Sequence, residues 1–505
     1  MKKQILMIIS IALALCLILG VCAVVVLMRE PEEDSPDQET TETTVQGKVD
    51  ESVKHNLPDD LDWGGAEVMF LIWSDHTMEE FYTKDPQANE IAQELYYRNL
   101  EVETQLGITI SYTERKGHSK TEWINALMAD SNAQAREYDI YATYSRTVPP
   151  LAMQGYLADL NQTKYIDLDK PWWPDALMES CSINDKLYFI SGDISTNLLW
   201  MMEGFFCNKQ LAEDYNLFAD GKNVYDLVLS NEWTYAKMFS LVADIYTDLN
   251  PNEQQDHDDF YGMTMSDTSI EAFFNSSGMR SVAKDADDYL SLSEDIGSER
   301  LYDLIDDVRT AIESNGVWYE QGSVPARELF TEQRAIMTID RLFVVAGKDN
   351  HEGGAGQADF NFYIAPVPKF DEAQKNYYTT LGYPYTLYAV NAQLSQDEQD
   401  KMSAVLECLA CENYNNITPV IFEKAMKLRY SSDEVAAKMY DIMRENVVFD
   451  MGRLFAETFG STNSPADLFV QQVTASETTL ASRLQGYRLG FKGAIDAINK
   501  KFQEG

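Results

Sequence analysis

Residues 67–73 read EVMFLIW, an apolar run of strand length that ends in the polar pair Ser74 and Asp75. A run of this kind is typical of a strand that is buried on both faces, as strands in parallel sheets are. A helical pattern follows from about 86 to 106, and a second strand is predicted at 108–112. A strand, a helix and a second strand in this order predict a βαβ unit.

The same alternation continues along the chain. A capping box at 119–122 introduces another helix, and the sequence YDIYATY predicts a strand at 138–144. The later part becomes helix-rich, with a capping box at 395–398 and a cap followed by proline at Thr418–Pro419. The pattern therefore predicts an α/β fold around a mostly parallel sheet, with a helix-rich C-terminal half.

The N-terminus carries a targeting segment. Residues 5–28 contain no charge, follow Lys2 and Lys3, and precede an acidic stretch. This length suits a membrane-spanning helix, and the flanking charges place everything after residue 28 outside the cell. We therefore assign residues 1–28 as an uncleaved signal anchor. The alternative is a lipoprotein signal in which Cys22 is acylated, because LGVC at 19–22 resembles a lipobox.

The next segment, 29–60, is rich in Glu, Asp, Thr and Pro and poor in large apolar residues. Such a segment cannot bury a core, so we predict a disordered acidic tether that holds the body, 61–505, at the outer face of the membrane.

Charge and cysteine usage exclude several classes of protein. The chain has 82 acidic and 40 basic residues, a net charge of −42, which disfavours nucleic-acid partners. Beyond the anchor only Cys181, Cys207, Cys408 and Cys411 remain, too few for a disulfide scaffold. The five histidines are scattered singly and show no metal-ligand spacing, and no cofactor motif is present.

Four long segments carry a family resemblance. They are NEIAQELYYRNLEVETQLGITI (89–110), YDIYATYSRTVPPLAMQGYLADL (138–160), NEWTYAKMFSLVADIYTDLN (231–250) and FYIAPVPKFDEAQKNYYTT (362–380). In this order they resemble the extracellular solute-binding proteins of ABC importers, in particular the large carbohydrate-binding type in its membrane-tethered, Gram-positive-like form.

The resemblance implies a two-lobed fold that closes on its ligand like a Venus flytrap. Lobe 1 would hold about 62–190 and 380–412, and lobe 2 about 191–379 and 413–505. The hinge crossings would lie near 190–192 and 381–383, where glycine can absorb a change of backbone angles. It further implies a monomer that hands its solute to the membrane subunits of the transporter.

Ligands of open α/β sheets bind beyond the carboxyl ends of the strands. A sugar site also needs aromatic rings against C–H faces, with charged groups for the hydroxyls. These two rules select residues at the ends of predicted strands and at the hinge crossings. The predicted ligand-binding residues are Trp73, Asp75, Tyr144, Arg146, Asp193, Arg341, Tyr383 and Tyr385. We expect a carbohydrate ligand, an oligosaccharide, with peptides and other polar solutes as alternatives.

The segment 248–259 offers oxygen side chains at the spacing of an EF-hand-like calcium loop, although Glu253 occupies the position where glycine makes the sharp turn. We favour a solvated acidic loop over calcium binding. The calcium ligands would be Asp248, Asn250, Asn252, Asp256 and Asp259.

Enzyme motifs are absent from the sequence: it has no G-x-S-x-G, H-E-x-x-H or P-loop. We therefore predict a protein that is not an enzyme. A tethered glycoside hydrolase is the enzymatic alternative, because its two carboxylates need only be close in space.

Overall fold

A computed structural model describes residues 53–75, 80–345, 360–427, 434–460, 464–475 and 478–504. The predicted anchor, its Cys22 and most of the predicted tether lie outside these residues. Among the helices described, none combines the length and the apolar character that a membrane crossing requires.

The first sheet has the strand order β12-β3-β1-β2. It consists of β1 (Ala66–Trp73), β2 (Ile108–Arg115), β3 (Ile140–Tyr144) and β12 (Thr386–Val390). Strand β1 runs parallel to both β2 and β3, whereas β12 is antiparallel to β3. Helix α3 (Glu90–Leu106) joins β1 to β2, and α4 (Lys120–Ala133) joins β2 to β3. The predicted βαβ units are confirmed.

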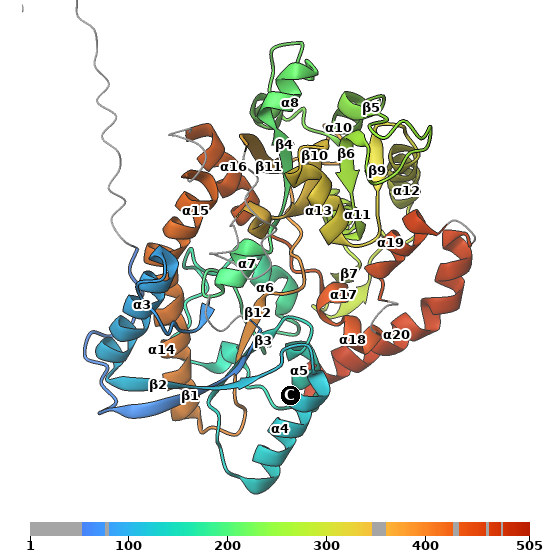
Figure 1. Ribbon diagram of the computed structural model, residues 1–505. Helices are drawn as coiled ribbons and strands as arrows, with labels where there is room; N and C mark the ends of the chain where they lie inside the picture. Colours follow the sequence, from blue (N-terminus) through green and yellow to red (C-terminus); the bar gives the residue numbers. More distant parts are fainter. Residues whose placement is uncertain are drawn as a thin grey trace, which may run out of the picture. The chain divides into compact units, whose positions relative to one another are not determined.

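Helices α3 and α4 lie on opposite faces of this sheet (Figure 1). The strand order explains why: the chain moves one way from β1 to β2 and the other way from β2 to β3, so right-handed crossovers place the two helices on different faces. The predicted capping box at 119–122 is not formed, because Ser119 makes no side-chain capping hydrogen bond. The box at Ser395 and Glu398 is formed and begins α14 (Gln396–Glu412).

The second sheet has the order β11-β4-β10-β6-β5, with β9 also paired to β6. Its strands are β4 (Glu203–Asn208), β5 (Tyr246–Thr247), β6 (Phe260–Met265), β9 (Val317–Tyr319), β10 (Ala335–Arg341) and β11 (Phe362–Pro366). The chain between these strands forms α8 (Lys209–Asp214), α9 (Val224–Leu229), α10 (Tyr235–Val242), α11 (Asp267–Ser276), α12 (Glu299–Ile312) and α13 (Ser323–Thr331). This sheet has a hydrophobic core of its own, which includes Trp233, Phe273 and Met337.

The chain passes from the first sheet to the second between Ile190 and β4, and it returns between β11 and β12. On the way out, Ile190 pairs with Tyr388 of β12, and α7 (Thr196–Trp200) leads to β4. On the return, Leu381 pairs with Met202, and the Gly382 N–H donates to the Met201 carbonyl at 2.8 Å.

Both hinge glycines are required by close contacts. A Cβ on Gly192 would lie 2.3 Å from the Trp172 carbonyl oxygen, and a Cβ on Gly382 would lie 2.5 Å from Cδ of Arg341. Gly192 also has φ +155°, a backbone angle that residues with a Cβ rarely adopt. The sequence suggested that glycine serves motion here, and the structure adds that there is no room for a side chain.

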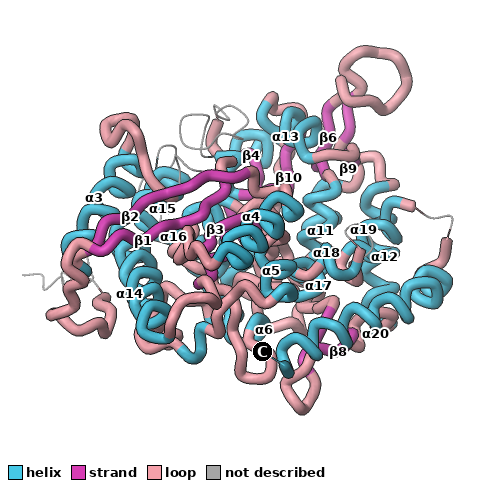
Figure 2. Tube along the Cα trace, turned by 90° about the horizontal axis from the view of Figure 1, so that it is seen from below, coloured by secondary structure: helices cyan, strands magenta, loops and turns pink. Residues whose placement is uncertain are grey.

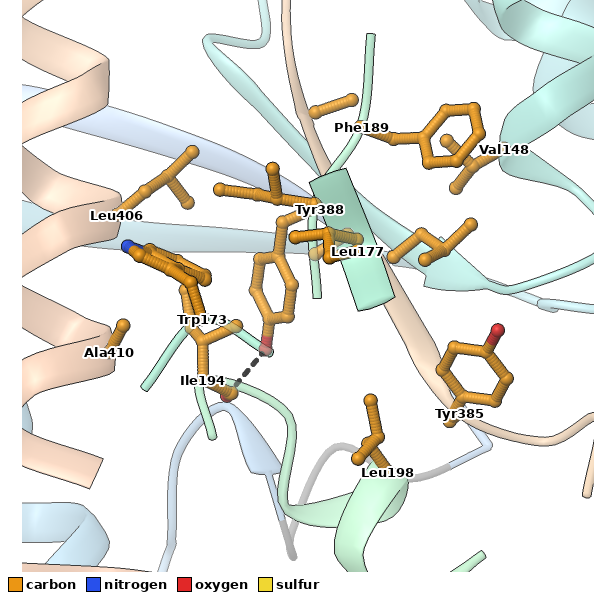
Figure 3. Packing of buried hydrophobic residues seen from close by; sticks show 14 of the residues in the cluster. Val148, Trp173, Leu177, Phe189, Ile194, Leu198, Tyr385, Tyr388, Leu406 and Ala410 are labelled. Carbon is orange, nitrogen blue, oxygen red and sulfur yellow. Dashed lines mark hydrogen bonds between the residues drawn. The ribbon is translucent and has the colours of Figure 1, made fainter. Parts of the chain in front are cut away.

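The largest core lies where the first sheet meets the outgoing crossing and α14 (Figure 3). The Tyr388 hydroxyl donates to the Ile194 carbonyl at 3.3 Å and to the carboxylate of Glu80 at 2.7 Å. Trp173 is buried and donates its indole N–H to Glu407 at 2.9 Å. Its neighbour Trp172 is fully buried, so both tryptophans are structural.

The C-terminal half is helical, as predicted. Helix α14 continues through a π-helical turn (Asn413–Ile417) into α15 (Thr418–Lys427), which begins at the predicted position, but Thr418 is itself helical and therefore does not act as the predicted cap. Further helices are α16 (Glu434–Glu445), α17 (Met451–Leu454), α18 (Ala456–Phe459), α19 (Asp467–Thr474) and α20 (Leu480–Glu504). The remaining elements are α5 (Val148–Gln154), η1 (Leu160–Gln162), α6 (Asp175–Cys181), η2 (Leu342–Val345) and a hairpin of β7 (Val282–Lys284) and β8 (Leu290–Leu292).

These C-terminal helices contact both parts of the body. Helix α16 packs against β11 of the second sheet, whereas α20 packs along the β7–β8 hairpin, as Figure 2 shows, and its Phe502 lies edge-on to Tyr188 at 4.8 Å. The assignment of 413–505 to lobe 2 therefore stays a prediction.

The described end of the predicted tether contacts the body: Val53 N–H donates to Asn415 at 3.1 Å, and Leu57 is buried. We accordingly restrict the proposed tether to residues 29–52.

Candidate functional site

Aromatic rings meet at the carboxyl ends of the first sheet. Trp73 of β1 and Tyr144 of β3 stack with ring centroids 5.7 Å apart, and the Trp73 indole donates to Thr386 Oγ1 at 2.9 Å. Trp73 is fully buried, whereas Tyr144 is half-buried. The exposed His118 packs edge-on against Tyr144 at 4.5 Å. Tyr144 and His118 are therefore the rings of this group that a ligand can reach.

Charged groups surround these rings. Arg146 pairs with Glu457 of α18 at 3.1 Å, and Lys120 pairs with the other carboxylate oxygen at 2.7 Å. The guanidinium of Arg146 lies 4.8 Å from the ring centre of Tyr383, on the return crossing. Burial raises the pKa of Tyr144 to about 12, against the opposing charge of Arg146, so the phenol stays protonated and can donate.

The second sheet reaches the same place through α11, which meets α17 there. Arg453 of α17 lies 4.2 Å from the ring centre of Tyr383 and pairs with Glu271 of α11 at 3.1 Å. The Nη2 atom of Arg453 donates to the Leu381 carbonyl at 3.1 Å. We call the connected residues Tyr144, Arg146, Glu271, Tyr383, Arg453 and Glu457 the interlobe cluster, because they join the two sheets and the return crossing.

Three charged side chains of the interlobe cluster are partly open to solvent. The exposed fraction is 20% for Arg146, 21% for Glu457 and 24% for Glu271. Carboxylates and guanidiniums at such positions can exchange a water for a ligand hydroxyl. The cluster thus offers aromatic faces, charged donors and charged acceptors in one place.

Glu203, at the start of β4, lies under this cluster. It is fully buried, and neither carboxylate oxygen has a hydrogen-bond partner among the described residues. Burial raises the pKa of Glu203 to about 8, helped by Glu271 and opposed by Arg453 and Arg341. The group is therefore largely protonated at neutral pH, which removes one negative charge from beneath the cluster.

Of the predicted site residues, Trp73, Tyr144, Arg146 and Tyr383 come together. Arg341 lies beside them, because its side chain packs on Gly382. Its guanidinium pairs with Asp340 at 3.4 Å and donates to Ser323 Oγ at 3.0 Å.

The other three predicted residues have different surroundings. Asp193 is only 3% exposed and is held by Thr418 at 2.8 Å and Arg444 at 3.1 Å. Tyr385 is buried and lies edge-on to Phe449. Asp75 accepts a hydrogen bond from Gly117 N–H at 2.8 Å, so it shapes the loop that carries His118. In this conformation Asp193 and Tyr385 offer a ligand almost no surface.

The sequence argument missed His118, Lys120, Glu271, Arg453 and Glu457. His118 and Lys120 follow the carboxyl end of β2, so the strand-end rule could have found them. The other three lie on helices remote in sequence, and no local signal marks them.

The acidic loop 248–259 is closed by its own hydrogen bonds. The amides of Asn250 and Asn252 both donate to Asp256, at 3.0 and 2.6 Å. Asp259 is buried and accepts from the Leu249 N–H and the Tyr246 hydroxyl. Within the described residues no three Asp, Glu, His or Cys side chains converge in a way that could hold a metal ion. Calcium binding, the alternative that the sequence disfavoured, gains no support from the described residues.

The four cysteines of the body, Cys181, Cys207, Cys408 and Cys411, are buried and free. Burial raises the pKa of Cys411 to about 11, so the thiol is not poised for redox chemistry.

Two α/β parts, crossed by the chain at a hinge and joined by a polar aromatic cluster, define the fold of a two-lobed solute-binding protein. Solved structures share it. One is the maltose/maltodextrin-binding domain from Bdellovibrio bacteriovorus bound to maltotriose, with 15% identity, a TM-score of 0.51, and coverage of 85% of this chain and 100% of that one.

Two further structures are similar. The cyclic alpha-maltosyl-1,6-maltose binding protein from Arthrobacter globiformis has 14% identity and a TM-score of 0.52, covering 88% of this chain and 100% of its own. The other is the galacto-N-biose-/lacto-N-biose I-binding protein of the ABC transporter from Bifidobacterium longum, in complex with lacto-N-biose. It has 12% identity and a TM-score of 0.50, and the match covers 86% of this chain and 98% of that one. No family model matches the chain, and no curated protein matches it. The chain thus has the fold of these sugar-binding proteins.

Proposed function

We propose that the protein is an extracellular solute-binding protein that captures an oligosaccharide and delivers it to the membrane subunits of an ABC transporter. The observation that carries this proposal is the interlobe cluster, which gathers rings and charged groups from both sheets at the carboxyl ends of β1 and β3. The shared fold with sugar-binding proteins supports it.

The chemistry of the cluster suits a sugar. The half-buried ring of Tyr144 and the exposed ring of His118 offer apolar faces for C–H groups. Arg146 and Glu457 can donate to and accept from hydroxyl groups, and a charge-assisted hydrogen bond is about twice as strong as a neutral one. Glu271, on α11 of the second sheet, and its partner Arg453 would contact the same ligand when the lobes close.

We also propose that the protein acts as a monomer at the outer face of the membrane, held by residues 1–28 as a signal anchor. The lipoprotein alternative, with an acylated Cys22, gives the same location. Mass spectrometry of the protein from membranes distinguishes them, because lipidation would remove the residues before Cys22.

A thermal-shift screen of the purified full-length chain against oligosaccharides and peptides tests the ligand class. A ligand at 100 times its Kd should stabilise the folded state by about 2.7 kcal/mol. We expect stabilisation by at least one oligosaccharide, including maltotriose or lacto-N-biose among the sugars tried. Stabilisation by peptides alone would contradict the carbohydrate proposal.

Tyr144→Ala should weaken sugar binding, because the contact between the tyrosine ring and a sugar face is lost. Tyr96→Ala is the matched control, since Tyr96 is 46% exposed on α3 and contacts no residue of the interlobe cluster in the described structure. Product analysis after prolonged incubation separates binding from catalysis: we expect intact sugar, and released fragments would favour the glycoside hydrolase instead.

A further inference from the structure

A second pocket lies apart from the interlobe cluster. It has a volume of about 480 Å³ and is lined by α6, Arg280, the β7–β8 hairpin, residues 376 and 378, the chain at 445–449, and Met451. None of its lining residues belongs to the interlobe cluster. Pockets of about 300–1,000 Å³ are the usual size for small-molecule sites.

Arg280 is the unusual residue of this pocket. Its guanidinium lies 4.7 Å from the ring centre of Tyr378, and Nη1 donates to the carbonyls of Met279 at 2.9 Å and Asn275 at 3.4 Å. No carboxylate of the described residues forms an ion pair with it, and Nε and Nη2 have no hydrogen-bond partner among them. Burial lowers the pKa of Arg280, in spite of the nearby carboxylates of Asp450, Glu179 and Asp295.

A half-buried cation without an ion pair is costly, because burial removes part of its hydration and the nearby carboxylates do not pair with it directly. An anionic group that enters the pocket can pair with Arg280 and reduce this cost. Lys284, the other cation of the lining, is already paired with Asp288 at 2.9 Å. Arg280 is therefore the group to which a ligand carboxylate would bind, and its two unpartnered nitrogens can hold both oxygens.

The rim of the pocket carries the opposite charge. Asp175, Glu179 and Glu445 line it and are exposed. Three carboxylates at the mouth would repel a simple anion but would attract a ligand that also carries an ammonium group. The buried side chains of Val282, Val447, Phe449 and Met451 complete the lining and suit an apolar body.

We propose that this pocket is a second ligand site that binds a small zwitterion with an apolar side chain, namely an amino acid or a short peptide. The carboxylate pairs with Arg280, the ammonium group faces the acidic rim, and the side chain packs on the apolar wall. The site is separate from the one proposed for sugars: α17 stands between them, with Met451 in the pocket and Arg453 in the interlobe cluster.

Isothermal titration of the full-length protein with L-leucine, L-phenylalanine and leucyl-leucine tests this proposal. At least one should bind, and N-acetyl-leucinamide, which lacks both charges, should bind at least ten times more weakly. Loss of a charge-assisted contact corresponds to about 10- to 150-fold in affinity. Arg280→Met should lose that factor, and Arg280→Lys should recover part of it.

Arg300→Met is the matched control. Its guanidinium also lies over an aromatic ring, Phe370 at 4.5 Å, and donates to a backbone carbonyl, but it does not line the pocket. Glu179→Gln, at an exposed position of α6, tests the rim without disturbing the core and should weaken binding. The proposal is overturned if no zwitterion binds, if the blocked compound binds equally well, or if both Arg280→Lys and Glu179→Gln bind like the wild type. These outcomes do not depend on any sugar.

Discussion

The ion pair between Asp193 and Arg444 should stabilise the hinge, and Asp193→Asn tests this. The carboxylate accepts hydrogen bonds from Thr418 Oγ1 at 2.8 Å and from Arg444 Nη2 at 3.1 Å and Nε at 3.3 Å. Burial raises the pKa of Asp193, against the opposing effects of Arg444 and Thr418. The pKa of Arg444 is also raised: burial, the largest single contribution, lowers it, and the attraction of Asp193 outweighs that.

Because the pKa of Asp193 is raised overall, the attraction of Arg444 only partly offsets the desolvation of the carboxylate. Removing one member is nevertheless expensive, because the other charge is left without its partner. Breaking a fully buried pair costs about 3–5 kcal/mol. The side chain of Arg444 is 18% exposed and can recover some hydration, so we expect a loss of about 2–4 kcal/mol in the free energy of unfolding.

Urea denaturation of the ligand-free protein measures this loss, and Arg444→Met together with the double variant completes a mutant cycle. A coupling of more than about 0.5 kcal/mol identifies the pair as the cause. Sugar affinity should change little, because Asp193 has almost no exposed surface. The reasoning is refuted if Asp193→Asn unfolds like the wild type but loses the ligand, since Asp193 would then be a binding residue.

Three further predictions follow from other contacts. Glu203→Gln should be more stable than the wild type above pH 8. The pKa of Glu203 in the folded state is raised from 4.5 to about 8, so the free energy of unfolding of the wild type falls by at most about 5 kcal/mol as the pH rises from 4.5 to 8. Denaturation measured across this pH range should show a flatter profile for the variant. Gly192→Ala should lower the free energy of unfolding by about 3 kcal/mol, because its Cβ collides with the Trp172 carbonyl; a thermal melt equal to the wild type would contradict this. Arg146→Met should reduce sugar affinity at least about 10-fold. It should leave the melting temperature nearly unchanged, because the partly exposed pair with Glu457 adds little stability.

The sequence predicted the strands at 67–73, 108–112 and 138–144 because their apolar runs are local signals bounded by polar turns. With the rule that ligands bind beyond the carboxyl ends of strands, it also placed Trp73, Tyr144 and Arg146 in one neighbourhood. Local composition and the strand-end rule were sufficient for this part of the candidate site.

Only the tertiary structure decided the rest. Asp193 follows a glycine at a crossing, as a ligand-binding carboxylate could, yet α15 and α16 bring Thr418 and Arg444 onto it from more than 200 positions away in the sequence. Glu271 and Arg453 join the interlobe cluster through the same kind of long-range packing. An ionisable side chain looks the same in a sequence whether it meets solvent or a partner of opposite charge. Its role is fixed by burial and pairing, which depend on how distant helices pack.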